Sequence, residues 1–78
     1  MLRVTTASGA VYLIDGMKVL REGPYSPNID YGTVPDNEWI EYDDINPIVV
    51  GLSAIFWGRR GFTVLDRVTT PVVSIEEV

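Results

Sequence analysis

Apolar residues of strand type gather in the stretch from Ile48 to Leu65. Eight of the ten residues from Ile48 to Trp57 are apolar, and most of these are β-branched or aromatic, which favours strand structure. The four residues Gly58-Arg59-Arg60-Gly61 then predict a turn before a second apolar run. The pattern as a whole predicts a central β-hairpin.

A helix over residues 47–57 is the competing interpretation of the same stretch. Asn46 as N-cap, Pro47 at the first helical position and Gly58 past the end have the chemistry of helix boundaries. However, four of the five residues from Ile48 to Leu52 are β-branched or glycine, and such residues lose conformational freedom in a helix. The strand is therefore preferred, and the helix stays open as the alternative.

A second hairpin is predicted near the N-terminus, after a first strand from Arg3 to Thr6. Residues 10–14 and 17–21 flank Asp15-Gly16, a dipeptide typical of a type I′ turn. A two-residue turn there pairs Ile14 with Met17 and Leu13 with Lys18. The two faces of this hairpin then carry Tyr12, Ile14, Met17 and Val19 on one side, and Val11, Leu13 and Leu20 on the other.

Both faces of this first hairpin are thus apolar, whereas a sheet with one wet face would alternate apolar and polar residues. Strand curvature in a small barrel buries parts of both faces. Otherwise another part of the chain, or a second copy of it, covers the second face. Val11, Leu13 and Leu20 are therefore the predicted self-association surface.

The rest of the chain predicts a loop and two more strands. Residues 23–37 contain three prolines and two glycines without periodicity, which indicates a long acidic loop. Residues 39–42 are predicted to form a short strand, and residues 68–75 are predicted to form the last strand. Pro71 is expected to confine that strand to an edge or to split it, because proline cannot donate to a ladder. Six or seven short antiparallel strands on 78 residues predict a single all-β domain over residues 1–78, built as a small β-barrel or a two-sheet β-roll.

The absence of two residue types limits the chemistry of this chain. It contains no cysteine and no histidine, which removes disulfides, thiolate nucleophiles, the commonest zinc ligand and the commonest general base. The order Asn28, Asp30, Gly32 is similar to an oxygen-ligand loop, but the glycine is misplaced for an EF-hand and the bidentate glutamate is missing. We expect no catalytic residues, no metal and no cofactor, and therefore no enzyme.

Charge is distributed unevenly along the chain. The net charge of the chain is −5. Residues 27–47 alone carry −6, with no basic residue among them, and the remaining residues carry +1. This weighs against direct binding to nucleic acid. Crowded like charges suggest a basic partner surface, although net negative charge also favours solubility. The candidate partner-binding residues are Asp36, Glu38, Trp39, Glu41, Tyr42, Asp43 and Asp44.

An arginine pair and the two tryptophans are candidates for contact with a partner or for the core. Arg59 and Arg60, placed at a hairpin tip, are the alternative partner-binding pair. Trp57 is assigned to the core by its apolar neighbours, and Trp39 to the rim of the acidic loop.

Nothing in the sequence indicates export or a membrane. The N-terminus lacks an apolar h-region, and the longest apolar run is about half the ~20 residues that a spanning helix needs. We expect a cytoplasmic protein.

Two stretches resemble a known group of proteins. Residues 4–15, Val-Thr-Thr-Ala-Ser-Gly-Ala-Val-Tyr-Leu-Ile-Asp, and residues 68–77, Val-Thr-Thr-Pro-Val-Val-Ser-Ile-Glu-Glu, are similar to the termini of short β-rich proteins of unknown function encoded by actinobacterial phages, mycobacteriophages in particular. Together they cover 22 of the 78 residues. The resemblance implies phage origin and expression in the host cytoplasm, and it transfers no site residue.

Three functions from different classes fit these observations. The first is a non-enzymatic phage accessory protein that acts by protein–protein interaction with a host or phage protein. The second is an acidic nucleic-acid mimic that inhibits a DNA-binding protein. The third is a small structural or assembly protein that forms a homo-oligomer.

Overall fold

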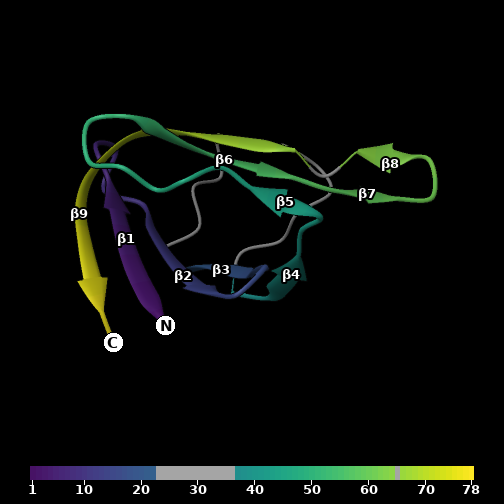
Figure 1. The fold of residues 1–78 in the computed structure, drawn as a ribbon, viewed down its shortest axis with the longest axis horizontal. Coiled ribbons are helices and arrows are strands. Elements are labelled where there is room, and N and C mark those ends of the chain that lie inside the picture. Colours follow the sequence, from purple (N-terminus) through teal and green to yellow (C-terminus); the bar gives the residue numbers. More distant parts are fainter. Residues whose placement is uncertain (23–36, 65) are drawn as a thin grey trace.

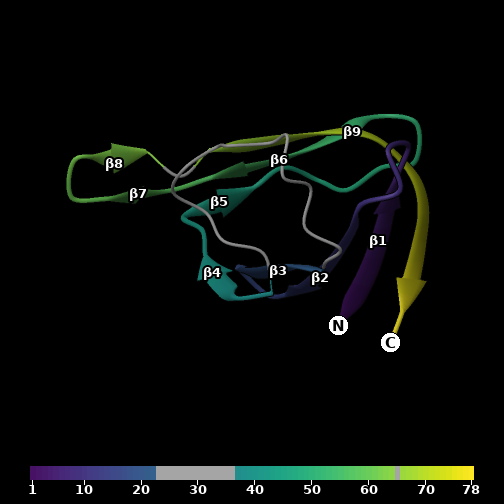
Figure 2. The same ribbon diagram turned by 180° about the vertical axis from the view of Figure 1, so that it is seen from behind.

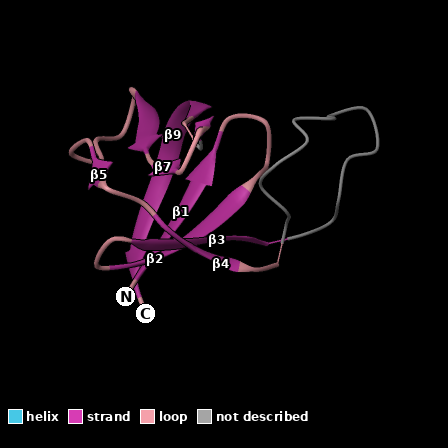
Figure 3. Cartoon of the chain, turned by 90° about the vertical axis from the view of Figure 1, so that its right-hand side faces the viewer, coloured by secondary structure: helices cyan, strands magenta, loops and turns pink. Residues whose placement is uncertain are grey.

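The computed structural model describes residues 1–22, 37–64 and 66–78. Of the long loop predicted at 23–37, only Asn37 falls within these ranges. The described residues form nine β-strands and no helix, and Figure 3 shows these strands and the loops that connect them. The all-β fold class is therefore confirmed, and the helical alternative at 47–57 is wrong.

Seven of the strands form one antiparallel sheet in the order β4-β3-β2-β1-β9-β6-β5, and the other two form a separate ribbon. The large sheet curls around its own interior like half of a barrel (Figure 1). In chain order the strands are β1 (Leu2–Thr6), β2 (Val11–Asp15), β3 (Lys18–Glu22), β4 (Trp39–Glu41), β5 (Asp44–Ile45), β6 (Ser53–Trp57), β7 (Arg59–Arg60), β8 (Thr63–Val64) and β9 (Arg67–Glu77).

Strand β9 lies in the middle of the sheet, so the prediction of an edge strand at Pro71 was wrong. Its first half pairs with β6 up to Pro71, and its second half pairs with β1 from Val72 onward. Both pairings shift register near this junction, where irregularity makes the missing proline N–H least costly. The Pro71 carbonyl still accepts a hydrogen bond from Ala7 N at 2.8 Å. The pairing of this strand thus splits in two, although the strand itself is continuous.

The core lies on the inner side of the curled sheet and centres on Phe56, which is fully buried. Its ring lies 5.6 Å from that of Tyr12 and 5.3 Å from that of Tyr42, centroid to centroid, in tilted arrangements, which aromatic pairs prefer. The buried apolar residues are Val4, Tyr12, Ile14, Val19, Tyr42, Ala54, Phe56 and Val72.

The first hairpin forms as predicted, but its turn lies one residue further along. Asp15 pairs with Lys18, and Leu13 with Leu20, so the turn residues are Gly16 and Met17. Gly16 has a φ of 62° while Met17 does not have positive φ, a pattern that fits a type II′ turn rather than the predicted type I′. Each residue of β2 therefore pairs two positions beyond the predicted partner, which leaves the two faces unchanged.

The central hairpin begins later than predicted. Residues 48–52 form no strand, and Gly51 bends the chain with a φ of 95°. Strand β6 starts at Ser53, and the ribbon β7–β8 turns at Gly61-Phe62. Arg59 and Arg60 therefore belong to a strand, and their predicted place at the tip was wrong.

The assignment of Trp57 to the core was also wrong, because the alternation of β6 turns it outward. Ala54 and Phe56 are buried, whereas Trp57 is 43% exposed. Its indole Nε1 donates a hydrogen bond to Asn46 Oδ1 at 3.0 Å. Neighbouring residues on a strand point to opposite faces, so the buried neighbour Phe56 takes the core position.

Substitution of these two neighbours tests the orientation of β6. Phe56→Ala is expected to lower the free energy of unfolding by about 3–5 kcal/mol, because it removes a fully buried aromatic ring. Trp57→Ala is expected to cost less than half as much. Urea unfolding of the two variants measures both losses. A larger loss in Trp57→Ala than in Phe56→Ala would contradict this orientation.

Candidate functional site

A row of apolar side chains crosses the outer face of strands β2, β3 and β4. Backbone pairing places Leu13 of β2 opposite Leu20 of β3, and Leu20 opposite Trp39 of β4. Val11 lies on the same face, two residues before Leu13. We call Val11, Leu13, Leu20 and Trp39 the outer-face row. The sequence predicted these residues as two separate surfaces, and the structure brings them together.

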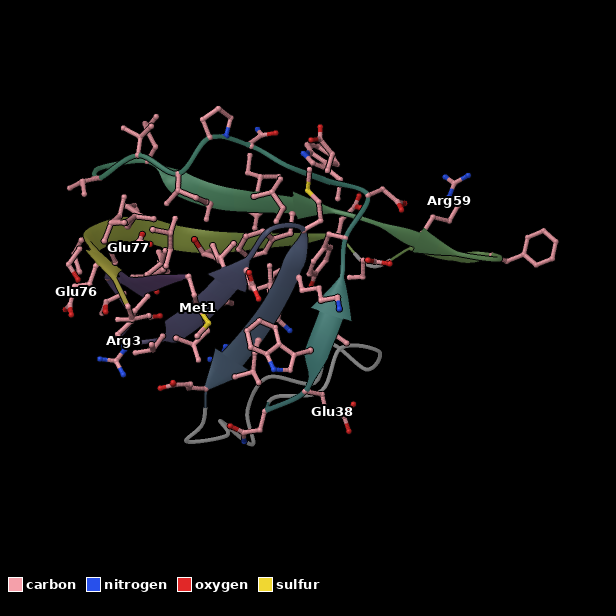
Figure 4. The ribbon with its side chains drawn as sticks, turned by 60° about the horizontal axis from the view of Figure 1, so that its bottom comes forward. Met1, Arg3, Glu38, Arg59, Glu76 and Glu77 are labelled. Atoms are coloured by element: carbon pink, nitrogen blue, oxygen red, sulfur yellow. The ribbon has the colours of Figure 1, made fainter. Side chains whose placement is uncertain are left out.

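Trp39 is the most prominent member of this row, with 44% of its surface exposed, while the other three are half-buried. Two acidic residues adjoin it, because Glu38 precedes it and Glu41 follows two positions later on the same face. Lys18 pairs with Glu41 across the strands. In Figure 4, Glu38 lies beside β4, whereas Arg3 and Glu76 lie on the β1–β9 side of the sheet. The row is therefore apolar in its middle and charged at its borders.

The other predicted acidic residues have structural partners. Asp43 Oδ2 accepts a hydrogen bond from Arg59 N at 3.0 Å, and Asp44 Oδ1 accepts one from Ile45 N at 3.0 Å. Both carboxylates thereby support the connection from β4 to β5 and the base of the β7–β8 ribbon. Asp36 lies outside the described residues.

Tyr42 does not share the outer face with Trp39, so its prediction as a partner-binding residue is corrected. Its side chain is only 3% exposed and packs against Phe56. Burial raises the pKa of its hydroxyl above the ordinary value of 10.0, against the opposing charge and hydrogen bond of Arg67. A buried hydroxyl that stays neutral is a poor general base.

The described residues hold no cluster of metal-ligating side chains. Among them no group of three or more acidic, histidine or cysteine side chains could hold a metal ion. Every buried side-chain nitrogen and oxygen within the same ranges has a hydrogen-bond partner, so none is left aimed at a ligand.

One surface feature was missed from the sequence. An open groove of about 420 Å³ is lined by Asn46, Pro47, Val49, Leu52, Ser53 and Ile55. Leu52 is 61% exposed and Val49 is 46% exposed, so much of this lining faces solvent. The available signal was the glycine at position 51 inside an apolar run, because a bend there keeps the preceding residues out of the sheet.

Comparison with known proteins adds no assignment. No family model, no curated protein and no solved structure matches the chain. Among the described residues, no helix is long and apolar enough to cross a membrane.

The raised pKa of Tyr42 predicts a pH dependence of stability. The unfolded chain ionises this tyrosine near pH 10.0, whereas the folded chain keeps it neutral to a higher pH. Above pH 10 the unfolded state therefore binds fewer protons, and the free energy of unfolding falls as pH rises through the interval between the two pKa values. The parent protein should lose stability there more steeply than Tyr42→Phe.

Denaturant unfolding of both proteins between neutral pH and pH 11 measures this difference. At neutral pH, Tyr42→Phe is expected to be less stable by about 1 kcal/mol, since it loses the hydrogen bond with Arg67. Equal slopes above pH 10 would show that Tyr42 ionises equally in both states.

Proposed function

We propose that this chain is a non-enzymatic binding protein that docks a protein partner on its outer-face row. The observation that carries the proposal is the half-exposed Trp39 in register with Leu20 and Leu13. Such an aromatic anchor surrounded by partly covered apolar residues is typical of binding hot spots. The similarity of both termini to short phage proteins supports the role of a phage accessory protein that acts on a host or phage protein.

The size of this surface suits a contact of moderate strength. An aromatic side chain buries about 150–250 Å². Covering the 44% of Trp39 that is exposed is therefore worth roughly 2 kcal/mol at about 25 cal/mol per Å². The half-buried leucines add smaller areas around it.

The charges beside Trp39 favour a partner with a basic rim. Glu38 and Glu41 adjoin the anchor, and charges at the border of an interface raise the association rate more than the affinity. The same arrangement is less suited to a nucleic-acid mimic, which needs carboxylates spaced along a surface like phosphates. Here Asp43 and Asp44 serve the protein's own backbone, and a tryptophan occupies the centre of the surface.

The test compares the proteins captured from actinobacterial lysate by the parent, by Trp39→Ala and by Trp57→Ala. The two tryptophans are almost equally exposed, so Trp57→Ala controls for the loss of any surface indole. We expect a partner that the parent and Trp57→Ala capture and that Trp39→Ala loses. Identical captured proteins for all three baits would place the binding surface elsewhere.

A purified partner then allows the acidic border to be tested separately. The double change Glu38→Gln and Glu41→Gln is expected to slow association and to weaken its dependence on salt, with a smaller effect on dissociation. Surface plasmon resonance at two salt concentrations measures both rates. Unchanged association rates at both salt concentrations would exclude a basic rim on the partner.

A further inference from the structure

The β7–β8 ribbon projects from the body of the protein as an arm. Its two strands pair with each other and with no other described strand. Figures 1 and 2 show the ribbon extending beyond the curled sheet in both views. The ribbon continues the pairing of β6 with β9 in the same register, since Phe56 pairs with Arg67 and Arg59 with Val64, but no third described strand supports it there. A two-stranded ribbon gains little stability from its own contacts.

Phe62 stands at the tip of this arm and is 107% exposed. Single exposed apolar residues are common on proteins, but this ring is completely surrounded by solvent at the end of a projection. Gly61, with a φ of 62°, makes the turn that presents it. Burial of such a ring in a partner is strongly favoured by the hydrophobic effect.

Two carboxylates fix the arm at its base. Asp43 Oδ2 accepts a hydrogen bond from Arg59 N at 3.0 Å. Asp66 Oδ1 accepts one from Gly58 N at 3.3 Å. Both bonds tie the start of the arm to flanking segments, so its direction is set before any partner binds.

Backbone hydrogen bonds hold one wall of the open groove beside β6. Gly51 N donates to the Val72 carbonyl at 2.8 Å, and Val72 N donates to the Leu52 carbonyl at 2.9 Å. These bonds fasten the groove wall to the buried part of β9, where Val72 is 1% exposed. A groove of about 420 Å³ with an apolar lining has the size and chemistry to take an aromatic ring.

The arm cannot reach the groove of its own chain. Ile55 is the last groove-lining residue, and the chain runs on from it through β6 and β7 to Phe62. At about 3.3 Å per residue of extended chain, Phe62 lies roughly 20 Å along the chain from Ile55, and the β7–β8 ribbon that carries it extends away from β6 (Figure 1). The two features therefore meet only between molecules.

Charge favours a second copy as the molecule that supplies the groove. Residues 58–64 contain two arginines and no acidic residue, so the arm carries +2. Subtracting this from the net charge of −5 leaves −7 on the rest of the chain. A basic arm of one copy is thus attracted to the acidic body of another. The negative charge outside the arm also repels the phosphate groups of nucleic acid, which disfavours insertion of Phe62 between bases.

We propose that the chain assembles head to tail, with Phe62 of one copy inserted into the groove at Leu52 and Val49 of the next. The two contacting surfaces differ, so each copy keeps one unused arm or groove after the first contact. Such heterologous contacts produce rings when they close and filaments when they do not.

Analytical ultracentrifugation over a range of concentrations tests this assembly. The parent is expected to form species larger than a dimer as concentration rises. Phe62→Asp and Leu52→Glu should each remain monomeric, while Met17→Asp should assemble like the parent. Met17 is a matched control, because it is exposed, apolar and outside both surfaces. Circular dichroism and urea unfolding establish that each variant is folded.

Mixing the two monomeric variants gives the most specific test. Phe62→Asp retains an intact groove and Leu52→Glu an intact arm, so an equimolar mixture should form a heterodimer and nothing larger. Three results would overturn the proposal: a parent that stays monomeric at its highest soluble concentration, assembly of Phe62→Asp equal to that of the parent, or a mixture without dimers. Binding of the parent to duplex or single-stranded DNA through Phe62, without self-association, would assign the arm to nucleic acid.

Discussion

The sharing of strand β9 between the two halves of the sheet is the constraint on which the fold depends. Its first half pairs with β6 and its second half with β1, so segments far apart in sequence enclose one core. Tyr12 comes from β2, Phe56 from β6 and Tyr42 from the residue after β4, and they meet because β9 continues from one half into the other. Pairings of this kind require closure of long loops, and burial of the aromatic cluster offsets that entropy.

Local patterns predicted those parts of the fold that depend on neighbouring residues. Alternation along residues 10–21 gave the right faces of the first hairpin although the turn was misplaced. The reason is physical: a shift of the partner by two positions preserves the side of the sheet on which each side chain lies. Val11, Leu13 and Leu20 therefore reached the predicted face with different cross-strand partners. A misplacement of the pairing by one position would have exchanged core and surface.

Features that depend on pairing between segments distant in sequence could not be predicted from local patterns. The interior position of β9 follows from its pairing with both β1 and β6, whereas a proline at position 71 by itself predicts an edge strand or a split one. The exposure of Trp57 depends on which residues of β6 face the core, which the pairing of β6 with β9 decides. The predicted site shows the same division. Trp39 was recognisable as an anchor by residue type, but its position beside Leu20 is a consequence of β3–β4 pairing.

The two proposed binding surfaces belong to different strands, and this separation affects how strongly an assembled array could bind. The outer-face row belongs to β2, β3 and β4, whereas the arm and the groove belong to β7–β8 and to the segment that ends in β6. The proposed head-to-tail contact therefore does not use Trp39. An array of copies presents the row repeatedly, and the first contact with a multivalent partner raises the effective concentration for the next. A surface whose anchor is worth roughly 2 kcal/mol is weak in one copy, and the proposed assembly would strengthen its binding to a partner that presents the same contact repeatedly.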